Sequence, residues 1–258
     1  LLPSLMRRAD WQHRAGYYND ERATYRRAVR IVEESAGKKD VRLIDPLMRL
    51  GGSFYYYEPP TDNLHRPVGS PPETYFKRAL RIAEETPDYP WLDLAKARLA
   101  LADYYVVTES YNRARKMYKE VWDALSTDED RLELRDELMG SPVPIWQEPL
   151  PDHTRGASGG PRNSSKLLTG AINVNYTISD RGRVRVINTE ANPPEFTDMQ
   201  RLVHREIRRR AFRPAIVDGV PVEASGQVFR HEFFYLESER EEIREQNAAQ
   251  EQASANKS

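Results

Sequence analysis

Residues 212–235 of this chain read FRPAIVDGVPVEASGQVFRHEFFY, and the expected architecture of the C-terminal half depends on them. Pro214 ends the helical pattern before it, because proline has no backbone N–H to donate within a helix. Asp218 and Gly219 then turn the chain. The residues from Gln227 to Tyr235 alternate as a β-strand. We therefore expect a strand that follows closely on a helix.

This last strand is apolar on both faces. Phe229, Phe233 and Tyr235 share one face with His231, whereas Val228 and Phe234 lie on the other. Such a strand specifies its register weakly and pairs readily with other strands, because a free edge offers unpaired N–H and C=O groups. We take this edge as the candidate partner-binding site. Its residues are Gln227, Val228, Phe229, Arg230, His231, Phe233, Phe234 and Tyr235.

A β-hairpin is expected upstream. Residues 170–178 alternate, and their apolar face consists of Ile172, Val174, Tyr176 and Ile178. Residues 179–182 read SDRG, which supplies a turn, and Val184 and Val186 continue the apolar face on the return strand. Asn192-Pro193-Pro194 ends that strand. The predicted order is strand, strand, helix, strand.

The helix between the hairpin and the last strand is rich in arginine. Thr197, with Gln200 three residues later, has the form of a capping box and predicts the helix start. An apolar stripe follows at Met199, Val203, Ile207 and Ala211. Residues 166–236 contain 11 basic and 8 acidic residues, and no aromatic residues interleave with the arginines to stack bases. The arginines are therefore interpreted as a solvated face, and no nucleic-acid partner is expected.

Residues 5–139 carry apolar residues at spacings of three and four, which predicts helices. The pattern repeats: Gly16, Tyr18, Tyr25, Ala28 and Val29 align with Tyr111, Ala114, Tyr118, Val121 and Trp122. This resembles the tetratricopeptide repeat, in which small residues let paired helices approach and aromatic residues fill the space between pairs. We expect three repeats, at about residues 5–35, 40–85 and 91–125, and a capping helix around 128–139. Glu21 departs from the small residue usual there, and residues 58–71 form an unusually long insertion.

Two segments show no sequence pattern that predicts a packed domain. Residues 140–165 are rich in proline and glycine without periodicity, so we expect a linker in which Ile145 and Trp146 dock back on their own domain. Residues 237–258 are polar and acid-rich, which predicts a frayed helix or a disordered tail. The expected domains are thus a helical-repeat array at 1–139 and a small domain at 166–236.

The C-terminal pattern resembles the C-terminal domain of TonB energy transducers. The resemblance spans about Leu168 to Tyr235 and rests on the order of its parts: the Gly170 strand, the turn with Asp180 and Gly182, FRPA at 212–215, DGVPV at 218–222, and the aromatic strand. It implies a ββαβ domain of the Gram-negative periplasm that engages a short segment of outer-membrane transporters by strand pairing. The family's Tyr-Pro pair before the first strand is missing from residues 155–166. The sequence as given also shows neither the family's membrane anchor nor its long Pro/Lys/Glu-rich spacer.

The composition and the absence of known motifs exclude several classes of function. The chain of 258 residues has no cysteine, which excludes disulfides and thiol nucleophiles, and its formal net charge of -1 indicates no polyanionic partner. The five histidines form no metal-ligand pattern, and no phosphate-binding glycine loop or nucleophile elbow occurs. We therefore expect no enzyme, no cofactor, no metal and no small-molecule substrate.

The sequence predicts a periplasmic protein-interaction adaptor of α plus α+β class that acts in cell-envelope transport or assembly. The expected partners are proteins, with an outer-membrane transporter or an envelope complex as candidates. The alternative is a structural scaffold subunit whose TonB-like domain only self-associates, as a homodimer, or packs on its own repeats. No apolar run reaches the length of a membrane-spanning helix. The predicted localisation also allows a membrane anchor in an N-terminal segment before Leu1.

Overall fold

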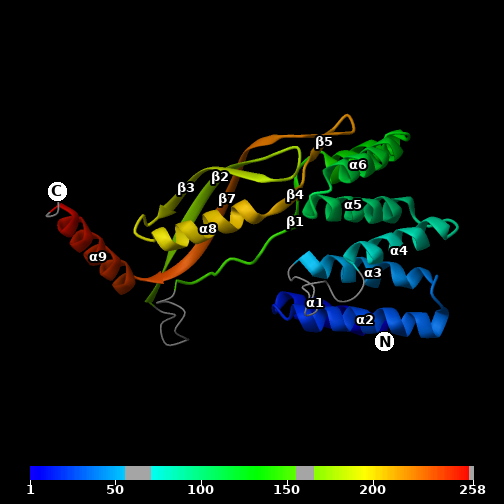
Figure 1. The fold of residues 1–258 in the computed structure, drawn as a ribbon, viewed down its shortest axis with the longest axis horizontal. Helices are drawn as coiled ribbons and strands as arrows, with labels where there is room; N and C mark the ends of the chain where they lie inside the picture. Colours follow the sequence, from blue (N-terminus) through cyan, green and yellow to red (C-terminus); the bar gives the residue numbers. More distant parts are fainter. Residues whose placement is uncertain (56–70, 155–165, 256–258) are drawn as a thin grey trace, which may run out of the picture. The chain divides into compact units, whose positions relative to one another are not determined.

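The structure is a computed structural model of the chain, and it describes residues 1–55, 71–154 and 166–255. The chain divides into two compact units (Figure 1). The helical unit contains Leu1–Ser141 and Ile216–Pro221, and the mixed unit contains Pro142–Ala215 and Val222–Ser258. Helices fill the N-terminal region and small antiparallel sheets follow, which confirms the expected mixture of α and β structure.

The helical unit consists of antiparallel helix pairs. Its helices are α1 (Leu2–Arg14), α2 (Tyr18–Ala36), α3 (Ile44–Gly52), α4 (Pro72–Glu85), α5 (Trp91–Val107), α6 (Tyr111–Leu125) and α7 (Leu132–Met139). Short 3-10 turns occupy η1 (Val41–Leu43), η2 (Ser53–Tyr55) and η3 (Glu129–Arg131). The most extensive helix packing is α1 on α2, α3 on α4, and α5 on α6. The predicted insertion at 58–71 falls almost wholly outside the described residues.

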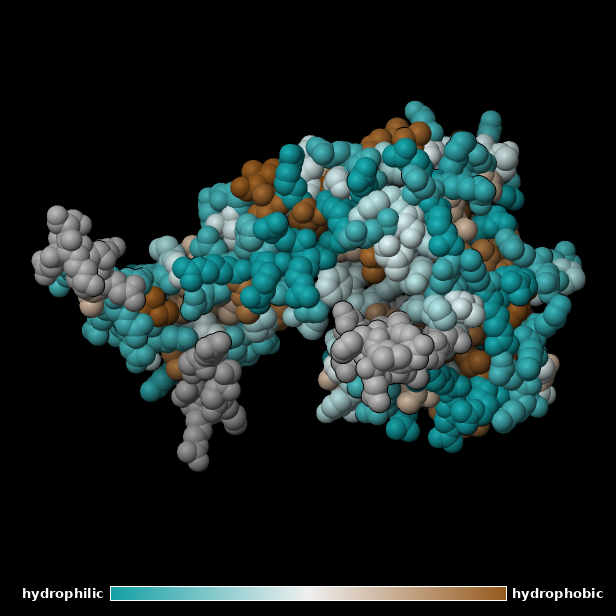
Figure 2. Space-filling model, viewed as in Figure 1, coloured by the Kyte–Doolittle hydropathy of each residue, from teal (hydrophilic) through white to brown (hydrophobic). Residues whose placement is uncertain are grey.

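Small residues allow the helices of this unit to approach. Ala9, Ala28, Ala79 and Ala102 are completely buried. Gly51 lies under the ring of Phe76, where even a methyl group would collide. Branched and aromatic side chains from α2, α3 and α4 fill the remaining core volume. Figure 2 shows that the visible face of this unit is largely hydrophilic, as expected where helices turn their polar faces to solvent.

The mixed unit is built on a three-stranded antiparallel sheet of order β3-β2-β7. Its strands and helices are β1 (Val143–Trp146), β2 (Leu167–Ile178), β3 (Val184–Asn192), α8 (Thr197–Arg209), β4 (Ala211–Arg213), β7 (Ala224–Leu236) and α9 (Glu237–Ala255). The short strands β5 (Ala215–Val217) and β6 (Val220–Val222) pair with each other around the turn at Asp218 and Gly219, both of which have positive φ. The strand, strand, helix, strand order is therefore present, with β4, β5 and β6 inserted before β7.

Alternation correctly predicted which side chains enter the core. Ile172, Val174, Tyr176 and Ile178 of β2 are buried together with Met199, Val203 and Ile207 of α8. Val184 and Val186 of β3 are partly buried against the same cluster. Helix α8 therefore covers the apolar face of the sheet (Figure 1).

The arginine-rich helix begins at Thr197 as predicted, but the capping box does not form and the predicted C-terminal end was wrong. The N-cap of α8 is Phe196, with no side-chain capping bond, and the Gln200 side chain instead donates to the carbonyl of Thr189 on β3 at 2.7 Å. The C-terminal end lies at Arg209 rather than next to Pro214, because residues 211–213 form β4 and pair with β1. Strand β1 contains Ile145 and Trp146 and lies within the segment expected to be a linker.

The segment expected to be a tail begins as a helix that packs on its own unit. Helix α9 starts at Glu237, and Ile243 contacts the core of the sheet domain. Glu195, in the loop before α8, accepts a hydrogen bond from Arg244 and lies 3.3 Å from Nε of Arg240. These contacts fix the first turns of α9 to the mixed unit.

Candidate partner-binding edge

The predicted partner-binding residues all lie on β7, which forms one edge of the three-stranded sheet. One side of β7 pairs with β2 in a continuous antiparallel register from Leu167 opposite Leu236 to Tyr176 opposite Gln227. The other side of β7 faces away from the sheet. Sequence and structure therefore agree that this is an edge strand.

The side chains of β7 divide between core and solvent. Phe233 is fully buried and Tyr235 is 5% exposed, and both pack against Phe196. Val228 is 69% exposed and Phe234 is 39% exposed, on the opposite face of the strand. Phe233 and Tyr235 therefore hold the strand in place from inside, whereas Val228 and Phe234 are open to contact.

The backbone of β7 also alternates. In an antiparallel pair, successive residues direct their N–H and C=O groups toward and away from the partner strand. Phe234 bonds through its backbone to residues outside β2, so its polar groups face outward, and the unbroken register gives Glu232, Arg230 and Val228 the same orientation. Among the described residues, no backbone hydrogen bond to these three outward positions is observed.

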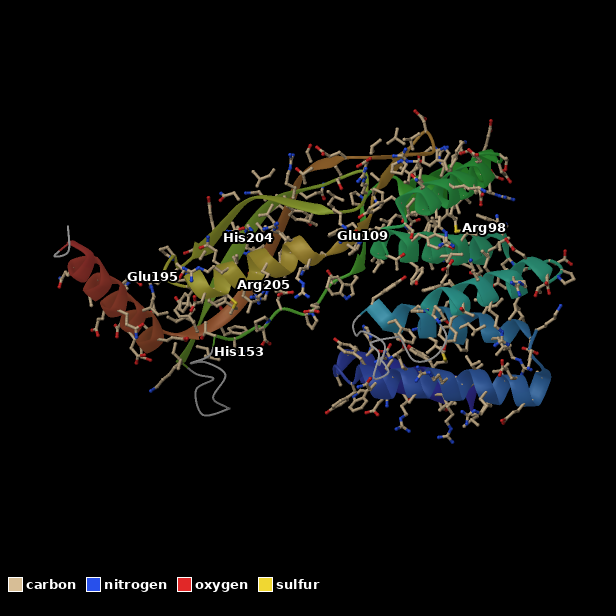
Figure 3. The ribbon with its side chains drawn as sticks, viewed as in Figure 1. Arg98, Glu109, His153, Glu195, His204 and Arg205 are labelled. Carbon is tan, nitrogen blue, oxygen red and sulfur yellow. The ribbon has the colours of Figure 1, made fainter. Side chains whose placement is uncertain are left out.

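The C-terminal end of this edge is occupied by the chain itself. The Phe234 N–H donates to the Asp152 carbonyl at 2.8 Å, and the Thr154 N–H donates to the Phe234 carbonyl at 3.0 Å. His153, which is labelled in Figure 3, thereby forms a parallel β-bridge with Phe234. The open part of the edge is consequently residues 227–232, and any strand that extends to Phe234 must displace residues 152–154.

Side chains reinforce this covering segment. The His153 ring lies 5.2 Å from the Phe234 ring, and Nδ1 of His153 lies 2.7 Å from the Asp152 carboxylate. The hydrogen bond from His153 lowers the pKa of Asp152. The His231 ring contacts the Pro151 carbonyl at 2.9 Å, and the Thr154 hydroxyl donates to Glu239 of α9. No sequence pattern predicts this contact, because four residues in a proline-rich segment show no alternation.

The opposite edge of the sheet is less accessible. The Thr189 carbonyl of β3 points away from β2 and accepts the Gln200 side chain, and the Thr189 hydroxyl lies 3.0 Å from Nδ1 of His204 (Figure 3). A side chain of α8 thus occupies the outward backbone carbonyl that a partner strand would need at the middle of β3. This leaves β7 as the better edge for pairing.

A buried cation supports the inner side of β7. Arg210 is 6% exposed, and its guanidinium lies 4.3 Å from the centroid of the Phe229 ring. Burial lowers the pKa of Arg210, although Tyr176 and Glu206 oppose this effect. A buried guanidinium gains from an aromatic face because little water competes for it. Arg210 therefore fixes the position of Phe229 at the open part of the edge.

The helical unit has an open cavity of about 430 Å³ between α1, α2 and α3, lined by Asp10, His13, Glu21, Tyr25 and Arg49 among others. Its acidic groups are already engaged. Asp10 accepts from Arg49 at 2.7 Å, and Glu21 lies 3.2 Å from His13. Burial raises the pKa of Glu21, and His13 opposes that effect. In the segments that the structure describes, no cluster of three or more His, Asp or Glu side chains is placed to hold a metal ion.

No protein-family model and no curated protein sequence matches this chain. Within residues 1–55, 71–154 and 166–255, no helix combines the length and the apolar character needed to cross a bilayer. The edge of β7 and the surfaces of the two units are therefore the features of the molecule that bear on its function.

Proposed function

We propose that the chain is a periplasmic protein-interaction adaptor of the cell envelope. In this proposal, a tetratricopeptide-like helical array holds one partner, and a TonB-like domain pairs its β7 edge with a strand of another. Joining two binding surfaces in one chain raises the local concentration of the second partner once the first is bound.

Two features support the resemblances on which the proposal depends. The helical unit is made of consecutive antiparallel pairs with small buried residues at their crossings, as tetratricopeptide arrays are. The mixed unit places a hairpin, a helix and a final aromatic strand in the order that the TonB-like pattern implies.

The observation that carries the proposal is the open edge of β7 at residues 227–232. Its outward N–H and C=O groups are available for a fourth strand, and Val228 offers an exposed apolar side chain beside them. Proteins usually protect such edges, so an open one favours strand addition as its role.

A scaffold subunit is the second candidate, because the same edge of a second copy could occupy the site. Two β7 strands that pair antiparallel would make a continuous sheet across a two-fold axis. The two candidates differ in what occupies the edge, so one set of variants can separate them.

Arg230→Pro is the variant that tests strand pairing at the open edge most directly. The Arg230 N–H faces outward, so proline removes an outward donor without removing a bond to β2. Arg230→Ala is the matched control, because it removes the same side chain and keeps the N–H. Deleting all of β7 would be uninformative, since Phe233 and Tyr235 belong to the core.

Crosslinking in native cells, followed by mass spectrometry, would identify the partners of the wild-type chain and of both variants. We expect Arg230→Pro to lose one envelope partner and keep the other, and Arg230→Ala to keep both. Loss of a dimer in light scattering by Arg230→Pro, with no change in crosslinked partners, would favour the scaffold. An unchanged partner list and an unchanged mass would refute both uses of the edge.

A further inference from the structure

Helix α1 carries a cationic face that the strand-pairing proposal does not use. Arg7, Arg8 and Arg14 are all exposed, together with Trp11. At about 100° of rotation per residue, these four positions fall within an arc of roughly 120° on one side of the helix. We call this set the α1 face.

The arginines of the α1 face are free of acidic partners. In the part of the chain that the structure describes, no carboxylate lies within ion-pair distance of Arg7, Arg8 or Arg14. Other arginines of the helical unit differ: Arg78 lies 2.6 Å from Glu33, and Arg98 lies 2.9 Å from Glu84. The positive charge of the α1 face is therefore not neutralised within the molecule.

The acidic residue of α1 is directed elsewhere. Asp10 accepts a hydrogen bond from Arg49 of α3 at 2.7 Å and another from the Tyr25 hydroxyl of α2 at 3.3 Å. The carboxylate of Asp10 is 38% exposed beside the α1 face, but Arg49 already pairs with it, so it does not neutralise the three arginines. On the neighbouring helix α2, Arg26, Arg27 and Arg30 are also exposed.

An exposed aromatic pair accompanies these charges. Trp11 is 57% exposed and Tyr17 is 53% exposed, and their ring centroids are 5.8 Å apart. Tryptophan and tyrosine are the side chains enriched where a membrane meets water, because each joins an apolar ring to a polar group. Basic residues near a membrane surface are attracted to anionic lipid headgroups, and a neighbouring tryptophan ring suits the headgroup level.

We propose that the α1 face docks on an anionic lipid surface, with the arginines contacting lipid phosphates and Trp11 entering the headgroup layer. A single exposed helix face is convex and suits a flat bilayer. Single-stranded nucleic acid, the other polyanion to consider, is usually bound in a positively charged groove. The inference is independent of strand pairing at β7, which belongs to the other unit.

The test is co-sedimentation of the 258-residue chain with lipid vesicles. Vesicles that mix phosphatidylglycerol with phosphatidylcholine should bind the chain, and vesicles of phosphatidylcholine alone should not. Raising the salt from about 0.1 M to about 1 M shortens the Debye length from about 10 Å to about 3 Å and should release it. The Arg7→Gln/Arg8→Gln/Arg14→Gln variant should bind roughly a hundredfold more weakly, since each arginine near the surface contributes about fivefold.

The matched control is Arg201→Gln/Arg205→Gln/Arg208→Gln, which removes the same charge from exposed positions of α8. It should bind almost as the wild type does, and an equal loss from both triple variants would overturn the proposal. Tryptophan emission should shift to the blue on anionic vesicles, and Trp11→Phe should abolish that shift. An unshifted spectrum, or tighter binding of a single-stranded oligonucleotide than of vesicles, would also overturn it.

Discussion

The ring of Phe233 lies directly over the backbone of Gly170, so that a methyl group built on Gly170 would stand 2.5 Å from Cζ of Phe233. The two residues face each other across the β2–β7 pair. Glycine here lets the fully buried ring lie flat on β2 and fixes the C-terminal half of β7 against the core.

We expect Gly170→Ala to lower the free energy of unfolding of the mixed unit by about 1 to 3 kcal/mol, because the ring must move within a packed core. Chemical denaturation followed by circular dichroism measures this loss. Thr169→Ala, one residue away on the exposed face, should change stability much less. Adding Phe233→Leu to Gly170→Ala should cost less than the two single changes together, because the smaller side chain relieves the overlap.

Gly51 and Gly52 provide a matched pair within α3. A methyl group on Gly51 would lie 2.7 Å from the Phe76 ring, whereas one on Gly52 would meet nothing closer than the Tyr55 ring at 4.0 Å. We expect Gly51→Ala to lower the thermal midpoint of the helical unit. Gly52→Ala should leave the midpoint unchanged or raise it, because alanine is more favourable than glycine within a helix by up to about 1 kcal/mol. Equal effects from both variants would contradict this account of the α3–α4 contact.

Local periodicity predicted the parts of the fold that neighbouring residues determine. The buried positions of β2 and the apolar stripe of α8 follow from side-chain spacing alone, since each face meets one core. The predicted capping box does not form, because the Gln200 side chain donates instead to a tertiary partner, the Thr189 carbonyl. The pairing of β1 with β4 joins residues about 70 positions apart in the sequence, and no local pattern in β1 predicts it.

The candidate edge was predictable only in part, for the same reason. Alternation identified β7 and the faces of its side chains. It did not reveal that His153 bridges Phe234, because a single bridge depends on where a distant segment returns. The sequence therefore identifies the strand, and the tertiary structure determines which part of its edge is open.

Glu73 should make the stability of the helical unit depend on pH. Burial opposes ionisation of Glu73, but hydrogen bonds from Lys77, Arg113 and Tyr105 outweigh it and lower its pKa to about 2. The Tyr105 hydroxyl donates to Oε1 of Glu73 at 2.9 Å, and the Arg113 guanidinium lies 4.0 Å from the centroid of the Tyr105 ring. Because the pKa is lower in the folded state, this contribution is complete above the unfolded pKa near 4.5 and is lost as pH falls toward 2.

We therefore expect Glu73→Gln to lower the free energy of unfolding by about 1 kcal/mol at pH 7, after allowance for solvent screening at this partly exposed group. The difference from wild type should shrink between pH 5 and about pH 2 in denaturation curves. Glu137→Gln, at an exposed carboxylate, should match the wild type throughout. A difference that stays constant over this range would show that the carboxylate charge is not the source of the stability.

Hydrogen exchange should reveal the open edge of β7 residue by residue. The amides of Phe229, His231 and Phe233 face β2 and should exchange slowly, whereas those of Val228, Arg230 and Glu232 face outward and should exchange fast. Phe234 should break the alternation, because its outward amide donates to the Asp152 carbonyl. Two-dimensional NMR at low protein concentration measures all seven amides in one experiment.

Thr154→Pro tests the covering segment on its own, since proline removes the N–H that donates to the Phe234 carbonyl. We expect this variant to accelerate exchange at Phe234 about five- to tenfold, because a lost backbone hydrogen bond of about 1 to 1.5 kcal/mol lets residues 152–154 leave the edge more often. His153→Ala keeps both backbone bonds and should change the rate less. If Arg230 and Glu232 exchanged as slowly as His231 in the wild type, the edge would be covered in solution and strand addition at residues 227–232 would be excluded.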